Sequence, residues 1–303
     1  MGKALAEAFA PARAVFDEVD AALGEKLSKT MWEGPAETLT LTENAQPALM
    51  AVSLAAMRVL EAEAGVVLSR DAKFVAGHSL GEYSALAAAG ALTVADTARL
   101  LRTRGRAMQQ AVPVGAGAMA ALLGMEFDAA VSVAAEAAQG QVCQVANDNG
   151  AGQVVVSGDK AAVERAVEIA KQKGAKRAML LNVSAPFHCA LMQPAADVMA
   201  DALSKVTVKR PAAPVVANVM AQPVVAPADI VRCLVEQVTG TVRWRECVAY
   251  MAQNGVTHFY EVGAGKVLTG LTKRIADGAT GAAIGTPDDI AAFKALAASA
   301  ARI

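Results

Sequence analysis

Apolar residues recur at helical spacing over three stretches before the middle of the chain. Residues 3–22 alternate apolar and polar positions with this period, and residues 46–64 form a stronger pattern in which Pro47 fits a first-turn position. Residues 94–111 predict a further helix that ends before the next proline. The first two helices are expected to cover a sheet.

A short apolar run stands between these helices. Residues 74–76 (Phe-Val-Ala) follow a polar segment and lead into Gly77-His78-Ser79-Leu80-Gly81, after which helix-forming residues dominate. This order predicts a strand, a tight turn and a helix.

The pattern changes between residues 115 and 184, where short apolar runs alternate with two helical segments. The order is strand, helix, strand, strand, helix, strand, which is typical of a ferredoxin-like unit. Beyond it, the spacing predicts helices at 190–204, 229–238, 244–253 and 266–276 and strands at 214–219 and 257–262. The expected fold class is therefore α/β, with a large domain of residues 1–114 and 185–303 on a parallel sheet and an inserted subdomain of residues 115–184.

Composition and charge narrow the class of protein. Of the 303 residues, 54% are hydrophobic and only 4% aromatic, which suits helices packed on a sheet better than a β-sandwich. The 28 Lys and Arg residues against 29 Asp and Glu residues give a formal net charge of −1. No global positive field would gather nucleic acid or anionic lipid, so neither is an expected partner.

Cysteines and termini exclude other classes. The four cysteines form no CxxC pair, which predicts a reduced interior without a metal site. The first 20 residues carry acids and lack the apolar core of a signal peptide, and the longest charge-free stretch, 107–125, contains Pro and Gly. The sequence therefore predicts a cytoplasmic protein without a membrane span.

Residues 77–81 match GxSxG, the pattern of a serine on a strained turn between a strand and a helix. The expected strand before it and helix after it make Ser79 a candidate nucleophile. In this setting the Leu80 N–H points at the anion site of the helix start and can stabilise an oxyanion. Both glycines are expected to be required because neighbouring elements pass too close for a Cβ.

A serine nucleophile needs a base, and the chain has three histidines. His78 adjoins the serine and is expected to be a hydrogen-bonded structural residue. His258 lies in an apolar strand pattern and is expected to pack in the sheet. His188 ends a loop stiffened by Pro186, from which its imidazole could reach Ser79, and is the candidate base.

Arg104 shares a helical stripe with Leu100 and Met108, so its guanidinium is expected to lie among apolar side chains. A buried guanidinium requires an anionic partner. That partner is either an internal carboxylate or the carboxylate end of an acyl substrate. Three neighbouring arginines fall on other faces of the helix and are expected to be solvated: Arg99, Arg102 and Arg106.

Two glycine-rich segments fail as nucleotide-binding loops. Gly263-Ala264-Gly265-Lys266 has Tyr260 where a phosphate loop needs its first glycine and Val267 where it needs Ser or Thr. Residues 115–117 follow a helix and precede a strand, the reverse of a dinucleotide turn. No nucleotide cofactor is expected.

Several segments together resemble one enzyme family. GHSLGEYSALAAAG, RTRGRAMQQAVP, GAMAALLG, NGAGQVVVSG, SAPFHCALM and EVGAGKVLTGL are similar, in order along nearly the whole chain, to malonyl-CoA:acyl carrier protein transacylases. The resemblance implies an α/β-hydrolase-like large domain with a ferredoxin-like insert. It also implies ping-pong transfer of malonyl from malonyl-CoA to the phosphopantetheine thiol of acyl carrier protein for fatty acid biosynthesis, with no cofactor beyond the thioester substrate.

The resemblance assigns roles to individual residues. Ser79 resembles the nucleophile, His188 the base and Arg104 the clamp for the malonyl carboxylate. The Leu80 N–H would be one oxyanion donor. Gln237 resembles the residue whose backbone carbonyl orients the histidine, so that no triad acid is needed.

Other positions are less decisive. Asn147 and Asn149 match a stretch that lines the acyl site in relatives, with a turn-forming role as the alternative. Phe187 resembles the malonyl-type members of the family. An acidic carrier protein would dock on a basic surface. The candidates are Lys171, Lys173, Lys176 and Arg177, or Arg243 and Arg245, with solvated helix faces as the alternative interpretation.

Relatives begin with a strand and a GQGSQ-like turn that this sequence, starting at Met1-Gly2, does not contain. The resemblance implies that the glutamine of that turn supplies a second oxyanion donor, and losing such a donor typically lowers a rate by about 10²–10³. The strand would be central to the sheet, so unpaired strand edges and exposed apolar surface are expected beside its place.

Two other functions stay open. A serine hydrolase needs the same serine and histidine but would favour a histidine late in the chain, an order that His258 would suit. Its simple ester substrates have no carboxylate for Arg104 to bind. A non-catalytic acyl- or carrier-binding protein would fit a chain with one oxyanion donor. Nothing in the sequence demands more than a monomer.

Overall fold

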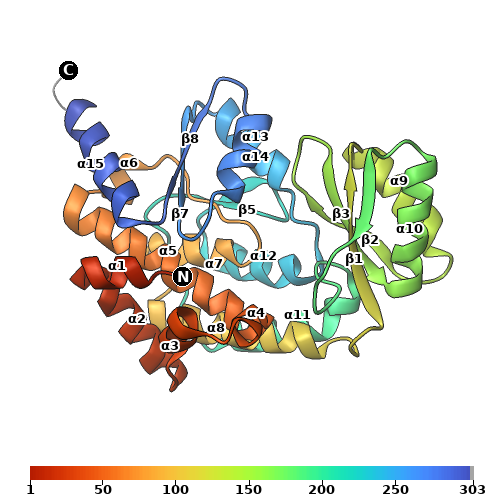
Figure 1. Cartoon of the computed structure of the whole chain (residues 1–303), viewed down its shortest axis with the longest axis horizontal. Helices are drawn as coiled ribbons and strands as arrows, with labels where there is room; N and C mark the ends of the chain where they lie inside the picture. Colours follow the sequence, from red (N-terminus) through yellow and green to blue (C-terminus); the bar gives the residue numbers. More distant parts are fainter. Residues whose placement is uncertain (301–303) are drawn as a thin grey trace.

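The computed structural model describes residues 1–300, and the side chains of residues 1–297. Helices around short strands form one part of the molecule, and a four-stranded sheet with two helices forms the other (Figure 1). No helix among residues 1–300 is both long enough and apolar enough to cross a membrane.

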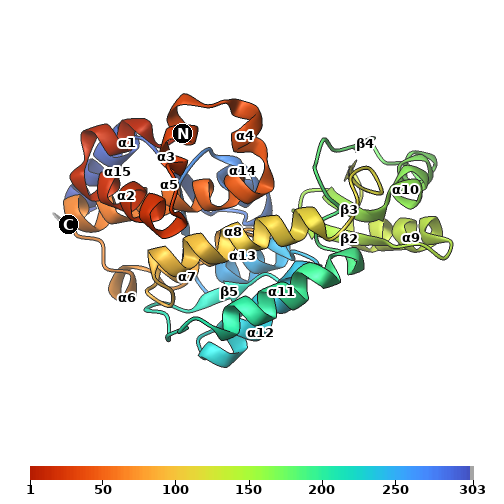
Figure 2. The ribbon, with the colours of Figure 1, turned by 90° about the horizontal axis from the view of Figure 1, so that it is seen from below.

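Two long helices form the centre of the helical part. Helix α5 covers Thr42–Ala64 and α8 covers Val94–Gln110, and the two pack against each other. Figure 2 shows α8 lying lengthwise between the N-terminal helices and α11 (Gln193–Ser204), so side chains on several of its faces are buried. The other helices of this region are α1 (Lys3–Ala8), α2 (Ala10–Leu23), α3 (Leu27–Glu33), α4 (Ala36–Thr40), α6 (Leu68–Asp71) and α7 (Gly81–Ala88).

Gly105 allows α8 to approach the start of α5. A Cβ at this position would lie 2.5 Å from the Cα of Glu43 and 2.7 Å from the carbonyl oxygen of Thr42. Both are backbone atoms, which cannot move aside without shifting the helix. The contact brings Gln46, one turn further along α5, against α8.

Residues 117–180 form the antiparallel four-stranded sheet, with strand order β2-β3-β1-β4. Because side chains alternate along a strand, Ala120, Leu122, Val154 and Val156 share one face, which the two helices cover (Figure 1). The elements are β1 (Gly117–Leu123), α9 (Phe127–Ala138), β2 (Cys143–Asp148), β3 (Gln153–Asp159), α10 (Lys160–Gln172) and β4 (Arg177–Leu180).

The strands of the helical part are short and pair two by two. β5 (Val215–Ala217) pairs with β6 (Gln222–Val224) in antiparallel fashion, and β7 (His258–Val262) pairs with β8 (Thr280–Ile284) in parallel. The remaining elements are a 3₁₀ turn (Ala190–Met192), α12 (Pro227–Thr239), α13 (Trp244–Gln253), α14 (Val267–Ile275) and α15 (Pro287–Ala300).

The parallel sheet expected in the large domain is much smaller than predicted. Within residues 1–300, parallel pairing is limited to β7 with β8 and to two isolated bridges, Val75 to Val215 and Asn147 to Val242. Residues 74–76 form a single bridge rather than a strand because the turn at Gly77 begins directly after them.

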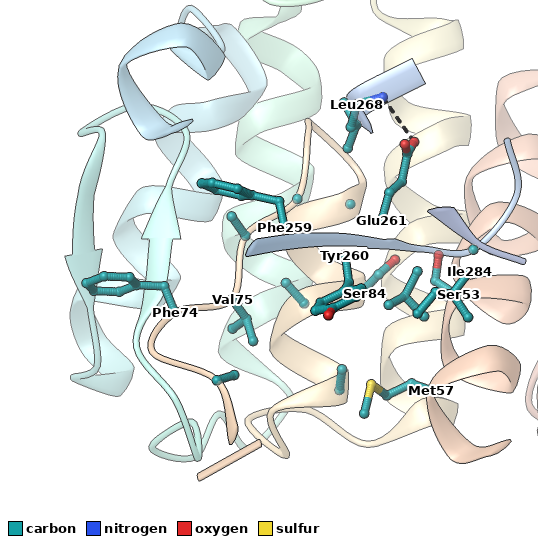
Figure 3. A pocket seen from close by; sticks show the side chains of 18 of the residues that line it. Ser53, Met57, Phe74, Val75, Ser84, Phe259, Tyr260, Glu261, Leu268 and Ile284 are labelled. Atoms are coloured by element: carbon teal, nitrogen blue, oxygen red, sulfur yellow. Dashed lines mark hydrogen bonds between the residues drawn. The ribbon is translucent and has the colours of Figure 1, made fainter. Parts of the chain in front are cut away.

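A cavity of about 1080 Å³ lies between residues 73–77 and β7, lined largely by apolar side chains such as Met57 and Ile284 (Figure 3). The Val75 N–H and C=O bond to the segment around β5, so those of Phe74 and Ala76 point to the other side.

The opposite wall of this cavity is also a strand edge. The C=O of Thr257 and the N–H of Gly263 bond to β8. The register directs the backbone groups of residues 259 and 261 to β8 as well. The backbone N–H and C=O groups of His258, Tyr260 and Val262 therefore point away from β8. Two strand edges and apolar side chains enclose the cavity.

Prolines explain where helix boundaries differ from the prediction. Residues 3–22 form two helices rather than one, because Pro11 lacks the N–H that would continue α1 and instead occupies the first turn of α2. Pro47 lies inside α5, which begins at Thr42, so the first-turn placement was wrong. α11 begins only at Gln193, with Pro194 in its first turn.

The helix contact at Gly105 gives a first prediction. Gly105→Ala should lower the free energy of unfolding by about 1–3 kcal/mol, because the added methyl group overlaps the backbone of α5. Gly270→Ala is the matched control, since Gly270 is also helical but has open space at the Cβ position. That change should raise stability by roughly 0.5–1 kcal/mol. Urea unfolding of both variants measures the difference, and equal effects would contradict the close approach of α8 to α5.

Candidate active site

Ser79 and His188 meet where the turn after residues 74–76 faces the loop before α11. The Ser79 Oγ lies 2.8 Å from His188 Nε2, and His188 Nδ1 lies 2.8 Å from the backbone oxygen of Gln237. A carbonyl oxygen only accepts, so Nδ1 carries the proton and Nε2 offers its lone pair to the serine hydroxyl. This is the tautomer that a general base requires.

The backbone of Ser79 is held in a strained conformation. Its φ of 52° lies in the left-handed region, which costs a residue other than glycine on the order of 1–3 kcal/mol. The Ser79 N–H donates to Asn218 Oδ1 at 2.7 Å, and its C=O accepts from Gln237 Nε2 at 3.0 Å and from the Glu82 N–H at 3.1 Å. These bonds hold the turn with the Ser79 side chain facing the imidazole.

Only one of the two motif glycines is required for space. A Cβ on Gly77 would lie 2.0 Å from the backbone of Gly81, which no small adjustment could relieve. A Cβ on Gly81 would meet nothing within 4 Å, so the expectation for Gly81 was wrong. The Gly81 backbone is itself the obstacle at Gly77.

Leu80 leads directly into α7. The next three N–H groups bond to the carbonyls of residues 78–80, whereas the Leu80 N–H has no hydrogen-bond partner among residues 1–300. A free N–H beside the serine, at the start of a helix, is placed as an oxyanion donor is.

Arg104 lies at the same point, buried with 1% exposure. Its Nη1 donates to Gln46 Oε1 at 2.7 Å, and its Nη2 donates to Gln237 Oε1 at 2.9 Å and to Ser79 Oγ at 3.1 Å. Its Nε has no hydrogen-bond partner in the described part of the chain. All its partners are neutral, and no carboxylate among the described residues lies within 4.0 Å, so the guanidinium has no internal salt bridge.

Gln237 contacts every member of this group through different atoms. Its backbone oxygen accepts from His188, its Oε1 accepts from Arg104, and its Nε2 donates to Ser79 O and to Glu82 Oε2. The resemblance implied a role only for its backbone. The side chain joins the Ser79 backbone, Glu82 and Arg104, whereas His188 contacts the backbone oxygen.

Burial shifts the pKa of two groups in the site. Burial, together with the positive charge of Arg104, lowers the pKa of His188 to about 3. The imidazole is therefore neutral at neutral pH, as a base must be. Burial raises the pKa of the Glu82 carboxyl to about 7, against the opposing effects of its hydrogen bonds.

The other histidines lie outside this group. His78 Nε2 lies 2.8 Å from Asn149 Oδ1, which fits a structural role and places Asn149 at His78 rather than at Ser79. His258 was expected to pack in the sheet, which is wrong. It is exposed because it is the first residue of β7, and its Nδ1 pairs with the Thr257 hydroxyl.

Two further expectations need correction. Asn147 lies within β2 and bridges to Val242 through its backbone, so a turn-forming role is wrong, and no hydrogen bond among the described residues joins it to Ser79. Arg102 is 8% exposed and bonds to Asn44 and Glu25. It is not solvated because α2 and α5 also pack against α8. Arg99 and Arg106 are exposed, as expected.

The helix start after the glycine-rich segment 263–266 is already occupied by a carboxylate of the chain. Figure 3 shows Glu261 pointing toward the start of α14, where it accepts from the N–H groups of Leu268 at 3.0 Å and Thr269 at 2.6 Å. A phosphate would need these same donors. Among the described residues, no cluster of three or more His, Cys, Asp or Glu side chains could hold a metal ion.

The basic candidates for a carrier surface divide into two groups. Each of four pairs with an acid: Lys171 with Glu168, Lys173 with Glu136, Arg243 with Glu246 and Arg245 with Asp148. Lys176 and Arg177, at the start of β4, form no ion pair within the described residues.

Sequence reasoning missed three residues of the site: Gln46, Glu82 and Asn218. Asn218 had a signal, because it is a polar residue directly after the apolar strand 215–217 and before further apolar residues. Glu82 has the sequence pattern of an ordinary acidic residue in the first turn of a helix. Gln46 lies on a different helix, which only tertiary packing brings near Arg104.

Comparisons with known proteins agree with this geometry. Residues 1–287 match the family described as "Acyl transferase domain". The malonyl CoA-acyl carrier protein transacylase of Escherichia coli strain K12 is 49% identical over 277 residues, which cover 91% of this chain and 88% of that protein. The chain belongs to the acyltransferase family of malonyl-CoA:acyl carrier protein transacylases.

Solved structures of the same acyltransferase family superimpose closely. The acyl-carrier-protein S-malonyltransferase from Bartonella henselae is 55% identical with a TM-score of 0.95, covering 98% of this chain and 95% of that one. A malonyl-transacylase solved in complex with a type II PKS acyl-carrier protein is 41% identical with a TM-score of 0.94, covering 98% of this chain and 94% of that one.

The pKa of His188 makes the stability of this acyltransferase depend on pH. A histidine whose folded pKa of about 3 lies below its unfolded value of about 6.5 contributes stability above pH 6.5 that is lost as the pH falls toward 3. His188→Gln removes this titration. Between pH 7.5 and 5 the natural chain should therefore lose up to about 2 kcal/mol more than His188→Gln in urea unfolding.

His258→Gln, on the exposed histidine, controls for introducing a glutamine. An equal loss in the natural chain and in His188→Gln would show that the buried imidazole titrates near its ordinary pKa.

Proposed function

We propose that the chain transfers the malonyl group of malonyl-CoA to the phosphopantetheine thiol of an acyl carrier protein in fatty acid biosynthesis, through a malonyl ester of Ser79. One observation carries the proposal: the Ser79 Oγ lies within hydrogen-bond distance of both a neutral imidazole and a buried guanidinium without a carboxylate partner. The names of the relatives and the neighbour solved with a carrier protein support the same reaction.

In the first half-reaction His188 Nε2 takes the hydroxyl proton while Ser79 Oγ attacks the thioester carbonyl. The carbonyl oxygen becomes an oxyanion, which the Leu80 N–H stabilises. The C–S bond then breaks and the leaving sulfur takes the proton from His188. Coenzyme A departs with a thiol, and malonyl stays on Ser79 as an ester.

The second half-reaction reverses these steps with a different thiol. The carrier thiol gives its proton to His188, its sulfur attacks the ester carbonyl, and the C–O bond to Ser79 breaks as the proton returns to Oγ. The site disfavours a charged imidazole. The negative charges of the oxyanion and the malonyl carboxylate therefore stabilise the imidazolium while His188 holds the proton. The proposed steps use no cofactor beyond the two thioester substrates.

Arg104 is the selective element in this proposal. The partners of the guanidinium are neutral, so the carboxylate of a malonyl group would supply the missing anion. A serine hydrolase acting on simple esters would leave this buried charge unpaired. The position of Phe187, packed beside Met119 and Ala146, is consistent with a pocket for a small acyl group.

We also propose the domain division drawn from the sequence, an α/β-hydrolase-like part of residues 1–114 and 185–303 with a ferredoxin-like insert of residues 115–184. The strand order β2-β3-β1-β4 and the two helices on one face support the second description. Lys176 and Arg177, on this insert and without an ion pair in the described residues, are the proposed contacts for an acidic carrier.

The resemblance implies one more strand and, on its GQGSQ-like turn, a second oxyanion donor. The cavity between residues 73–77 and β7 supports a place for such a strand, because both edges offer alternate N–H and C=O groups and its lining is largely apolar. A strand there would lie beside the serine turn. We propose that an extension carrying it raises the rate of acylation.

Intact-protein mass after brief exposure to malonyl-CoA tests the function. The natural chain should gain one malonyl group, Ser79→Ala should gain none, and added carrier protein should remove the label. A version extended by the family's strand and GQGSQ-like turn should label about 10²–10³ times faster. A label that stays on Ser79 in the presence of carrier would favour a binding protein, and no label in any folded form would refute the transacylase.

Selectivity tests the role of Arg104. Arg104→Met keeps an unbranched side chain but removes the charged end of the guanidinium. The preference for malonyl-CoA over acetyl-CoA should therefore fall about 10- to 100-fold, from the roughly 1.5–3 kcal/mol of hydrogen bonds to a charged group. Arg106→Met, on the exposed face of the same helix, is the control and should keep the preference. Comparing kcat/KM for the two thioesters decides, and an unchanged ratio in Arg104→Met would place the carboxylate elsewhere.

A further inference from the structure

Two ionisable groups of opposite sign are buried beside the serine turn without touching. The pKa of Glu82 is about 7, so its carboxyl is ionised above neutral pH. Arg104 and Glu82 are each 1% exposed, and they form no ion pair with each other. Each isolated charge would be costly in this setting unless another group compensated it. The mechanism above uses Arg104 and leaves Glu82 without a role.

The side-chain amide of Gln237 lies between them. Its Nε2 donates to Glu82 Oε2 at 2.8 Å, and its Oε1 accepts from Arg104 Nη2 at 2.9 Å. Only one orientation of the amide satisfies both ends, because a carboxylate must accept and a guanidinium must donate. The amide dipole thus has its positive end at the anion and its negative end at the cation.

A second group, on the turn between β5 and β6, also holds the Glu82 carboxyl in place. The Asn218 N–H donates to the same Oε2 atom at 3.0 Å, and the Asn218 side chain fixes the Ser79 N–H and the Gly77 C=O. The carboxylate therefore accepts from groups on both the β5–β6 turn and α12. Its place under the serine turn is set by backbone as well as by side chains.

Arg104 is the cation that faces Glu82. The ionisable groups around the carboxylate are Tyr83 on α7, Arg104 on α8, Cys233 on α12 and Cys247 on α13. Burial raises the pKa of the phenol and of both thiols, so they stay neutral near pH 7. A compensating charge for Glu82 within this group comes from the guanidinium alone.

We propose that Glu82 is a positioning residue for acyl selection, the counter-charge of Arg104 acting through the Gln237 amide. Ionised Glu82 decides which end of the amide faces the guanidinium, and so holds Arg104 charged beside Ser79. A carboxylate in direct contact with Arg104 would compete with the substrate for the same donors. The indirect pairing leaves the guanidinium without a carboxylate in direct contact, so the carboxylate of an incoming acyl group can take that place, a use that rests on the proposed function.

Glu82→Gln should remove the charge and keep the hydrogen bonds of the carboxylate. The new amide oxygen can take the place of Oε2, which accepts from both the Asn218 N–H and Gln237 Nε2. The Gln237 amide then keeps its orientation, so the substitution isolates the loss of the counter-charge of Arg104.

A double-mutant cycle in urea unfolding tests the coupling without using the reaction. Glu82→Gln and Arg104→Met are measured singly and together. The unfolding constant of the double variant should differ from the product of the two single effects by about tenfold or more. Glu82→Gln should destabilise the chain less when Arg104 is already replaced. Asp20→Asn combined with Arg104→Met is the control. Asp20 is also buried, but it bonds to Ser28, and this pair should be additive.

Coupling below twofold would overturn the proposal. If Glu82→Gln alone does not fold, the double variant decides, because recovery of folding supports the pairing and failure refutes it. A second readout is the ratio of malonyl to acetyl transfer, which should fall about tenfold in Glu82→Gln. If Ser79 is never acylated, the proposed function fails while the unfolding cycle still judges the pairing of Glu82 with Arg104.

Discussion

The buried charge of Arg104 is the constraint on which the site depends. A guanidinium with 1% exposure must be surrounded by acceptors, and here they come from three parts of the chain: Gln46 on α5, Gln237 on α12 and Ser79 on the turn before α7. Each of these elements therefore has to be placed to within a hydrogen bond of α8. Gly105, the next residue, allows that approach on one side, because a larger side chain would hold α5 away.

The serine turn depends on the same contacts. A left-handed backbone conformation is unfavourable for a serine by itself. Ser79 is held in it by the hydrogen bonds of its N–H to Asn218 and of its C=O to Gln237. Gln237 also fixes the tautomer of His188 through its backbone oxygen. Gln237 on α12 thus supports the strained backbone of Ser79, orients the imidazole of His188 and accepts from Arg104. A carbonyl oxygen, rather than a carboxylate, orients the imidazole.

The sequence predicted those parts of the structure that local pattern determines. The GxSxG turn, α13 and the stripe that buries Arg104 follow from spacing along one element, and all three were placed correctly. The burial of Arg102 and the role of Glu82 were missed because each depends on which helices or turns pack against it from far along the chain. His258 was misplaced because an apolar strand pattern does not reveal which end of the strand is open to solvent.

The cavity between residues 73–77 and β7 and the Ser79–His188 pair are different places joined by one segment. Phe74 and Ala76 present their backbone groups to the cavity, and Gly77, which follows at once, begins the turn that carries Ser79. Whatever pairs with that edge must fix the direction in which the chain enters the turn, because Val75 is tied to β5 by a single bridge. Hydrogen bonding along the cavity and the position of the nucleophile are therefore coupled through three residues of backbone, which is why a strand in the cavity would act on catalysis as well as on stability.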